Sequence, residues 1–249
     1  MLRVVSLVPS VTETLLAWGV VPIACTRFCE QPSIAHVGGT KDPDVRAIRA
    51  LVPDLVVLDE EENRREDYEA LRASGLEVLA LAVRSVPDVR DALEELAARL
   101  GIAAAGHPRL LEAWPKVAGG DVRRAFVPIW RRPWIALGAP TYGASLLAGL
   151  GIASVHADDG PYPPTTLEEA ASRRPDLVIA PSEPYPFSLR QRAELETVAP
   201  ACFVDGKDLF WWGVRTVGAP SRLAAALEAS LSWPQPRARR GNDEGSGAP

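Results

Sequence analysis

The sequence predicts an α/β protein of two similar lobes, each built on a parallel sheet, with a ligand cleft between them. The main observation is an internal repeat: PDLVVLDEE at 53–61 returns as PDLVIAPSE at 175–183. Short apolar runs also alternate with helix-like stretches along the chain, which is typical of parallel strands joined by right-handed crossovers. Two similar α/β halves indicate two lobes, and ligand sites commonly lie between lobes.

Two further pairings support the repeat. LLAWGV at 15–20 pairs with LLAGLGI at 146–152, and LEVLAL at 76–81 pairs with ACFVDG at 201–206. The predicted strands, in chain order, are 4–8, 54–58, 78–83, 125–130, 176–180 and 201–206. They are rich in β-branched residues, as strands buried on both faces are.

Residues that commonly begin or end helices, together with the spacing of apolar residues, predict three helices in the first half of the chain. The predicted helices are Thr12–Trp18 after a Ser10 or Thr12 cap, Arg64–Ser74 before Gly75, and Pro87–Leu100 before Gly101. A glycine directly after a helical pattern commonly ends the helix. Each helix therefore lies between two predicted strands, as a crossover connection requires.

Four segments make up the predicted domain organisation. They are an N-terminal α/β lobe at 1–85, a helical bridge at 86–122, a C-terminal α/β lobe at 123–233 and a tail at 234–249. Within the bridge, His107–Lys116 predicts a short helix with Pro115 near its end. The tail has almost no apolar residue, so we expect it to be disordered.

Composition excludes several classes of protein. The formal charge of −5, with no strongly basic run in the body of the chain, argues against nucleic acid as a partner. The longest apolar stretch, Leu15–Cys25, is interrupted by Gly19 and Pro22 and is too short to span a bilayer. We therefore expect no membrane insertion, and a monomer that binds a small molecule.

The N-terminus predicts a location. Met1 is followed at once by the strand-like RVVSLV, without the charged and apolar regions of a leader peptide. Three cysteines give no disulfide framework. The expectation is a cytoplasmic protein as written, or a periplasmic or cell-surface protein if a leader has been removed or missed.

Enzyme signatures are missing from the sequence. No GxxxxGK[ST], GxGxxG, GxSxG or HExxH motif occurs. His36, His107 and His156 are far apart, and Cys25 and Cys29 have no second ligand pair nearby. We therefore predict a binding protein rather than an enzyme, with no metal site or cofactor of its own.

Aromatic and arginine residues gather after predicted strands, where ligands collect in open parallel sheets. The members are Trp130, Arg131, Trp134, Tyr142, Tyr185, Phe187, Trp211, Trp212 and Arg215. Flat rings and guanidinium groups offer stacking faces and hydrogen-bond donors. This combination predicts a large planar or macrocyclic anionic ligand; the alternative is that the tryptophans only fill the ends of the sheets.

An acidic run, Asp59–Glu62, also follows a strand. It is either a solvated loop before a helix N-terminus, where carboxylates are favoured, or a docking patch. Glu183 stands at the equivalent place in the second half.

Longer segments resemble a known family. SLVPSVTETL at 6–15, VGGTKDPDVRAIRALVPDLVV at 37–57 and GLEVLAL at 75–81 resemble the helical-backbone (TroA-like, class III) periplasmic binding proteins. EENRREDYEALRASG, IWRRPW, SEPYPF and VDGKDLFWWG are similar to a leaderless subgroup near the vitamin B12 receptor branch. The resemblance covers roughly residues 2–230.

The resemblance implies two Rossmann-like lobes joined by a single bridging helix, with cobalamin or a similar metal chelate bound between them. It adds Phe28 and Cys29 to the candidate ligand residues. It also implies that one glutamate per lobe docks on an ABC permease. The candidates for docking are Glu61, Glu62 and Glu66 in the first lobe and Glu183 in the second.

Three other functions stay open. A siderophore or haem receptor would use the same aromatic residues. A receptor for a bare metal ion would need His36, His156, Asp205 and Asp208 to converge. A cytoplasmic enzyme or sensor would clamp a small anion with Arg131, Arg132 and Arg215, with Asp205 or Glu183 as base.

Overall fold

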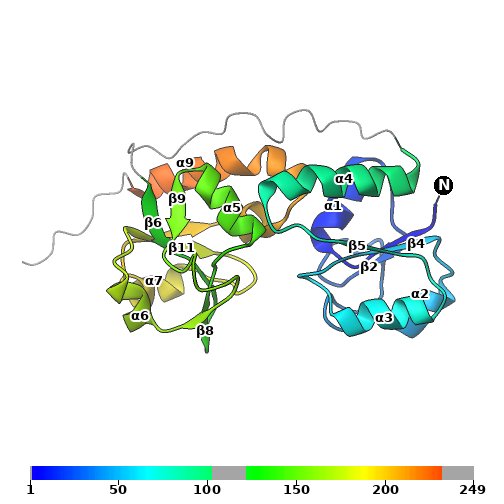
Figure 1. Cartoon of the computed structure of the whole chain (residues 1–249), viewed down its shortest axis with the longest axis horizontal. Helices are drawn as coiled ribbons and strands as arrows, with labels where there is room; N and C mark the ends of the chain where they lie inside the picture. Colours follow the sequence, from blue (N-terminus) through cyan, green and yellow to red (C-terminus); the bar gives the residue numbers. More distant parts are fainter. Residues whose placement is uncertain (1, 103–121, 232–249) are drawn as a thin grey trace, which may run out of the picture.

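A computed structural model describes residues 2–102 and 122–231 of this chain and shows two α/β lobes (Figure 1). The predicted helix at His107–Lys116 and the predicted disordered tail lie outside the described residues. The first lobe holds a five-stranded parallel sheet in the order β3 (Ala35–His36), β2 (Ala24–Cys25), β1 (Val4–Ser6), β4 (Leu55–Asp59) and β5 (Val78–Leu81). This order, 3-2-1-4-5, matches five of the six strands of a Rossmann fold.

The second lobe repeats that order. Its parallel sheet runs β12 (Ala201–Val204), β11 (Leu177–Pro181), β6 (Arg123–Phe126) and β9 (Ile152–Ser154). Strands β4 and β11, which carry the repeated sequence, both lie inside their sheets, between β1 and β5 and between β6 and β12 respectively. The predicted two-lobe α/β fold with parallel sheets is thus confirmed.

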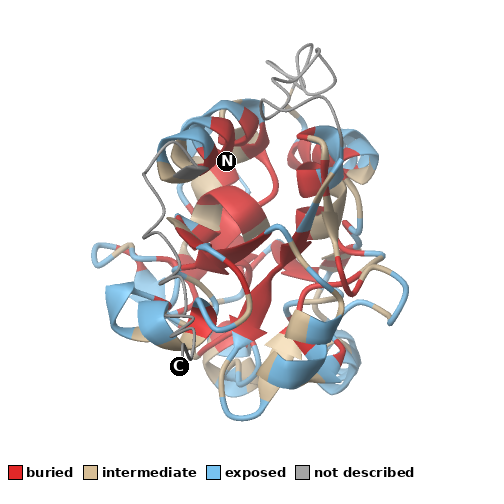
Figure 2. Cartoon of the chain, turned by 90° about the vertical axis from the view of Figure 1, so that its left-hand side faces the viewer, coloured by how far each residue is buried: buried red, intermediate tan, exposed pale blue. Residues whose placement is uncertain are grey.

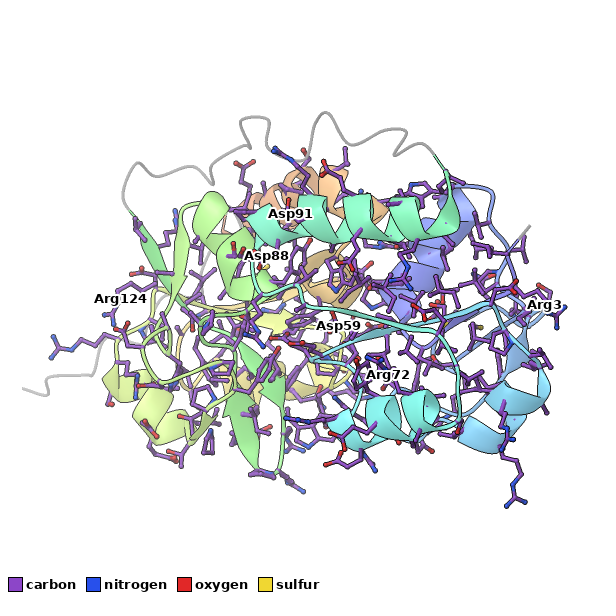
Figure 3. All side chains as sticks on the ribbon, turned by 45° about the vertical axis from the view of Figure 1, so that its right-hand side comes forward. Arg3, Asp59, Arg72, Asp88, Asp91 and Arg124 are labelled. Carbon is purple, nitrogen blue, oxygen red and sulfur yellow. The ribbon has the colours of Figure 1, made fainter. Side chains whose placement is uncertain are left out.

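The same pair of hydrogen bonds occurs at equivalent positions of the repeat in both lobes. In the first lobe the Arg3 backbone N–H donates to Asp54 Oδ2 at 2.7 Å, and the Asp54 N–H donates back to the Arg3 carbonyl at 2.8 Å. Arg124 and Asp176 form the same pair of bonds at 2.7 Å each. Figure 3 labels Arg3 and Arg124 at opposite ends of the molecule. The aspartate of each PDL motif therefore fastens its strand to the neighbouring strand.

The second lobe also departs from prediction. The run at 125–130 is not one strand: it divides at Val127 into β6 and β7 (Pro128–Trp130). β7, β8 (Trp134–Ala136) and β10 (Pro164–Thr165) form an antiparallel sheet, because the turn at 131–133 reverses the chain. Trp130 and Trp134 therefore stand on a hairpin, not at the end of a parallel strand.

The helices agree with prediction except at one start. α1 (Pro9–Ala17) begins before Thr12, and its cap is Val8 rather than a serine or threonine. Pro9 explains this, because its fixed φ and missing N–H suit the first helical position. α3 (Arg65–Ala73) and α4 (Val86–Leu100) end as expected, with Gly75 and Gly101 at positive φ.

The remaining helices cover both faces of each sheet. They are α2 (Val45–Ala50), α5 (Tyr142–Gly149), α6 (Leu167–Ser172), α7 (Arg192–Leu195), α8 (Gly206–Phe210) and α9 (Ala219–Leu231), with 3₁₀ turns η1 (Leu189–Gln191) and η2 (Val214–Val217). In Figure 1, α4 and α9 lie along one side of the molecule, and α2, α3, α6 and α7 lie on the other. No helix within the described ranges is long and apolar enough to cross a membrane.

The largest apolar core belongs to both lobes. Buried side chains of α1 and α4 pack in one continuous cluster with those of α5 and α9, including Leu15, Leu93, Leu146 and Leu227. Figure 2 shows the buried strands enclosed by helices whose outer faces are exposed. Each lobe has a second, separate core on the far face of its sheet. The lobes are therefore packed against each other on one side and not merely connected.

Candidate functional site

In the part of the chain that the structure describes, ion pairs and hydrogen bonds join side chains of the first lobe to side chains of the second at three places, which we call the inter-lobe contacts. Tyr162 donates its hydroxyl to Glu61 Oε2 at 2.8 Å. Lys207 Nζ lies 2.5 Å from Glu30 Oε2. Arg215 makes a two-bonded pair with Glu13, at 2.5 and 2.9 Å.

The Glu13–Arg215 pair belongs to a larger network of ion pairs. Arg215 also donates to Asp208 at 3.0 Å, and Asp208 is paired with Arg222. The carboxylate partners, Glu13 first, raise the pKa of Arg215 and keep it charged. Next to this pair the N–H of Val214 donates to Thr14 Oγ1 at 3.3 Å, so η2 is held against α1. This network fixes how the lobes meet.

Glu61 and Glu183, which occupy equivalent places in the repeat, have equivalent surroundings. Glu61 accepts from Tyr162, and Glu183 Oε2 accepts from the Trp211 indole N–H at 3.0 Å. Desolvation raises the pKa of both carboxyls, although these hydrogen bonds oppose the shift. Each glutamate is therefore a partly desolvated acceptor beside an aromatic ring.

The acidic run turns sharply at the end of β4. Asp59 is 2% exposed, and its Oδ1 accepts the N–H groups of Glu61 at 2.9 Å and Glu62 at 3.2 Å. Asn63 holds the turn, since it accepts from the Asp59 N–H and donates to the carbonyls of Leu7 and Thr40. The run is therefore an ordered turn that aims Glu61 at Tyr162, not a loosely solvated loop. Figure 3 shows Asp59 near the middle of the molecule.

Glu62 and Tyr162 belong to the same part of the surface. Both are exposed to solvent, yet desolvation by the surrounding protein raises the pKa of the Glu62 carboxyl and of the Tyr162 phenol. The surrounding protein therefore disfavours the ionised form of both side chains. Tyr162 comes from the loop before β10, and Glu62 from the turn after β4.

The segments that carry the Glu30–Lys207 contact each hold an aromatic residue. Phe28, two residues before Glu30, is 50% exposed, and the Arg27 guanidinium lies 4.7 Å from its ring centroid. In the second lobe, Lys207 Nζ lies 4.9 Å from the ring of the half-buried Trp211. Trp211 therefore lies beside the ion pair, and Phe28 stands close to it along the chain.

The hairpin aromatics form a row within the second lobe. Trp130 meets Tyr185 edge to face, with ring centroids 5.8 Å apart, and Tyr185 contacts Phe187 at 4.6 Å. Phe187 stacks on Trp134 at 6.0 Å. Only Trp130, at the end of the row, is an exposed side chain. The row supports the β7–β8 hairpin and presents Trp130 to solvent.

Several predicted ligand residues lie in the interior. Tyr142 is 3% exposed and shares a hydrogen bond with Thr216, and Phe187 and Trp212 are each 4% exposed. Cys29 is buried, with its Sγ 3.2 Å from the hydroxyls of both Thr12 and Thr26. These four side chains pack the lobes. Among the tryptophans that the structure describes, Trp212 is the one that is buried in this way, whereas Trp130 is exposed.

Two of the three arginines expected to clamp an anion are already paired with carboxylates. Arg131 pairs with Glu194 through two bonds of 2.9 and 3.1 Å, and Arg215 pairs with Glu13 and Asp208. An anionic ligand would have to break these pairs. Arg132, on the turn of the β7–β8 hairpin, is exposed.

The residues for a bare metal ion do not converge. His36 lies on edge strand β3, whereas His156 is buried in the second lobe and hydrogen-bonded to Asp159. Asp205 caps α8, and Asp208 is held by two arginines. Within 2–102 and 122–231, no three His, Cys, Asp or Glu side chains are grouped as metal ligands.

Sequence reasoning missed Tyr162, Glu30 and Lys207. Tyr162 lies in the loop GPYPP, where an aromatic residue between prolines was the available signal. Lys207 lies inside VDGKDLFWWG, next to the aromatic residues that drew attention. Glu30 has no distinguishing sequence context, and only the folded arrangement brings it to Lys207.

Comparison with known proteins gives a consistent result. The family model described as periplasmic binding protein matches residues 4–198. A vitamin B12-binding protein of Salmonella choleraesuis (strain SC-B67) is 26% identical over 189 residues, which is 71% of each chain.

Two solved structures have the same fold. The periplasmic vitamin B12 binding protein BtuF of Vibrio cholerae is similar with a TM-score of 0.75 and 19% identity, over 92% of this chain and 98% of that one. The periplasmic heme-binding protein BhuT, in complex with two hemes, is similar with a TM-score of 0.78 and 19% identity, over 93% and 99%.

Proposed function

This chain belongs to the periplasmic binding protein family, and we propose that it binds cobalamin or a related metal chelate between its two lobes. The proposal rests on the family, on the vitamin B12-binding relative and on the geometry of the inter-lobe contacts. It assigns no chemical step to the protein, because the role of such a protein is to hold and release its ligand.

One observation carries the proposal. Aromatic residues of the second lobe lie at the inter-lobe contacts, Tyr162 hydrogen-bonded to Glu61 and the half-buried Trp211 beside Lys207, and the exposed Phe28 of the first lobe stands two residues before Glu30. A flat or macrocyclic ligand between the lobes would stack on such rings, and each ring contact contributes about 1 kcal/mol beyond the area it buries. Because Trp211 is already oriented by Glu183, its ring is ready to receive the ligand without much loss of side-chain entropy.

A fluorescence titration tests the proposal. Purified protein is titrated with cyanocobalamin and, separately, with zinc protoporphyrin, and the quenching of tryptophan emission is followed. We expect saturable binding, weakened by about tenfold or more in Trp211→Ala, since an aromatic anchor that contacts the ligand typically costs more than 1 kcal/mol when truncated. Tyr68→Ala, which removes a ring of α3 that lies against Arg72, is the control and should bind as the wild type does. Absence of saturable binding to either chelate would refute the proposed function.

We further propose that the ligand is delivered to an ABC permease. Glu62 and Glu66 are both exposed first-lobe candidates for docking, whereas Glu61 accepts the hydrogen bond from Tyr162. Delivery to a permease would require this protein to lie outside the cytoplasmic membrane, whereas a protein that carries its ligand inside the cell would remain in the cytoplasm.

Fractionation of the producing cells, followed by immunodetection, distinguishes these two roles. Recovery of the protein only in the cytoplasmic fraction would contradict permease delivery.

A further inference from the structure

The Glu30–Lys207 contact is made by a residue in an unusual backbone conformation. Glu30 has a φ of 53°, in the left-handed region that few residues other than glycine adopt. Its carboxylate reaches the other lobe, where Glu30 Oε2 lies 2.5 Å from Lys207 Nζ. Backbone conformations of this kind persist only where the surrounding structure holds them, and they gather at sites that bind ligands. The conformation of Glu30 therefore raises the question of what this contact does.

The turn that carries Glu30 is anchored within the first lobe. The Cys29 N–H donates to the Thr26 carbonyl at 3.1 Å, and the buried Cys29 Sγ lies 3.2 Å from the Thr26 hydroxyl. The Arg27 guanidinium pairs with Asp42 through two bonds of 2.9 and 3.1 Å. An anchored backbone therefore presents the Glu30 carboxylate to the second lobe.

In the second lobe, Lys207 lies against the ring of Trp211. Lys207 Nζ lies 4.9 Å from the ring centroid, and the Trp211 backbone N–H donates to the Lys207 carbonyl at 2.9 Å. The indole N–H of the same ring donates to Glu183 Oε2 at 3.0 Å. A cation this close to an aromatic ring is attracted by the ring. One ammonium group thus contacts a carboxylate of the first lobe and the ring that we propose to receive the ligand.

The lobes do not depend on this contact to stay together. They share the large apolar core of α1, α4, α5 and α9, and the Glu13–Arg215 pair joins them a second time. The side chain of Glu30 is 65% exposed, and an exposed ion pair contributes little to the stability of a fold. Loss of the Glu30–Lys207 pair should therefore leave the fold intact and act mainly on the Trp211 ring.

We propose, on the basis of the proposed function, that Glu30 and Lys207 are positioning residues that hold the Trp211 ring in place for the ligand. Because the shared core keeps the lobes together, the pair is retained when the ligand enters. The pair restrains the ring before the ligand arrives, so less side-chain freedom is lost on binding. Glu30 thereby gives the first lobe a part in binding a ligand that stacks on a ring of the second lobe.

Affinity for cyanocobalamin and for zinc protoporphyrin, followed by the quenching of tryptophan emission, tests this role. Glu30→Gln and Lys207→Met should each weaken binding by about three- to tenfold, because a side chain that was held in advance must now be ordered by the ligand. In the Lys207→Met background, Glu30→Gln should have no further effect, since the partner of the carboxylate is already gone.

Two further measurements separate positioning from a structural role. The thermal midpoint of Glu30→Gln should stay close to that of the wild type, as expected of an exposed pair. The affinity of the wild type should weaken more with added salt than that of Glu30→Gln, because salt screens the ion pair that the variant lacks. Glu69→Gln, which breaks the exposed pair with Arg65 on α3, is the control and should bind as the wild type does.

The outcomes are distinguishable. If Glu30→Gln binds as tightly as the wild type or more tightly, the positioning role is wrong while the proposed function stands. A further loss from Glu30→Gln in the Lys207→Met background would show that Glu30 acts apart from Lys207, and an equal loss in Glu69→Gln would assign the effect to net charge; either result overturns the role. If the wild type binds neither compound, the proposed function itself fails.

Discussion

At the scale of single residues, Asp59 combines burial with an incomplete set of partners. One carboxyl oxygen caps the turn to Glu61 and Glu62, while the other is buried without a partner among the described residues. Desolvation raises its pKa from 3.8 to about 7, although the two backbone bonds oppose the shift. Because the folded pKa lies above the unfolded one, the native state binds more protons between these values. The contribution of Asp59 to stability is therefore fully present below about pH 4 and lost as the pH rises toward 7.

Asp59→Asn should remove this pH dependence. We expect the variant to be more stable than the wild type at pH 8, by about 1–3 kcal/mol, and to match it below about pH 4, where Asp59 is protonated in both the folded and the unfolded state. Urea unfolding at several pH values measures the free energy of unfolding of the variant and of the wild type. Asp91→Asn, on the exposed side of α4, is the control and should keep the wild-type slope. A variant that is less stable than the wild type at pH 8 would show that the charged form is favoured.

At the scale of elements, the contact between η2 and α1 depends on Gly213. Its φ of 118° with ψ of −142° suits only glycine, and an added Cβ would lie 2.3 Å from Thr14 Oγ1 of the other lobe. Gly213 therefore permits both an unusual backbone conformation and a close approach of the lobes.

Gly213→Ala should lower the free energy of unfolding by about 1–3 kcal/mol and loosen the lobes. Gly218→Ala is a matched control, because its φ is −102° and an added Cβ would meet only the flexible end of Arg222. Thermal unfolding of the two variants side by side is the measurement. Equal stability of the two would mean that η2 does not need this close approach.

The elements also show what the sequence could predict. The repeat predicted β4 and β11, because both copies are long apolar strands inside a sheet and local pattern and tertiary environment agree. The prediction of one strand at 125–130 was wrong. The apolar pattern of this run does not reveal that a new strand begins at Pro128, or that the turn at 131–133 reverses the direction of the chain. Trp211 as a ligand residue and Glu183 as a docking residue stay predictions, and the structure shows that the two are hydrogen-bonded to each other. The contacts of Tyr162 and Glu30 could not be predicted, since they form only when the two lobes meet.

At the scale of the whole molecule, the shared core should make the lobes unfold together. Side chains of α1, α4, α5 and α9 form one buried cluster, so neither lobe can unfold without exposing apolar surface of the other. Scanning calorimetry should give one transition whose calorimetric and van't Hoff enthalpies agree. Glu13→Gln, which weakens the pair with Arg215, should lower the midpoint and keep a single transition. Two separate transitions in the wild type would contradict a common core.

The central claim is that the two lobes hold a metal chelate between them, and calorimetric titration with cyanocobalamin tests it most directly. We expect one site per chain, with a dissociation constant of about 1 μM or tighter and a negative heat-capacity change from burial of the rings of Phe28, Tyr162 and Trp211. No measurable heat with cyanocobalamin, and none with zinc protoporphyrin, would show that the two lobes do not hold a metal chelate and that this fold binds a ligand of another kind.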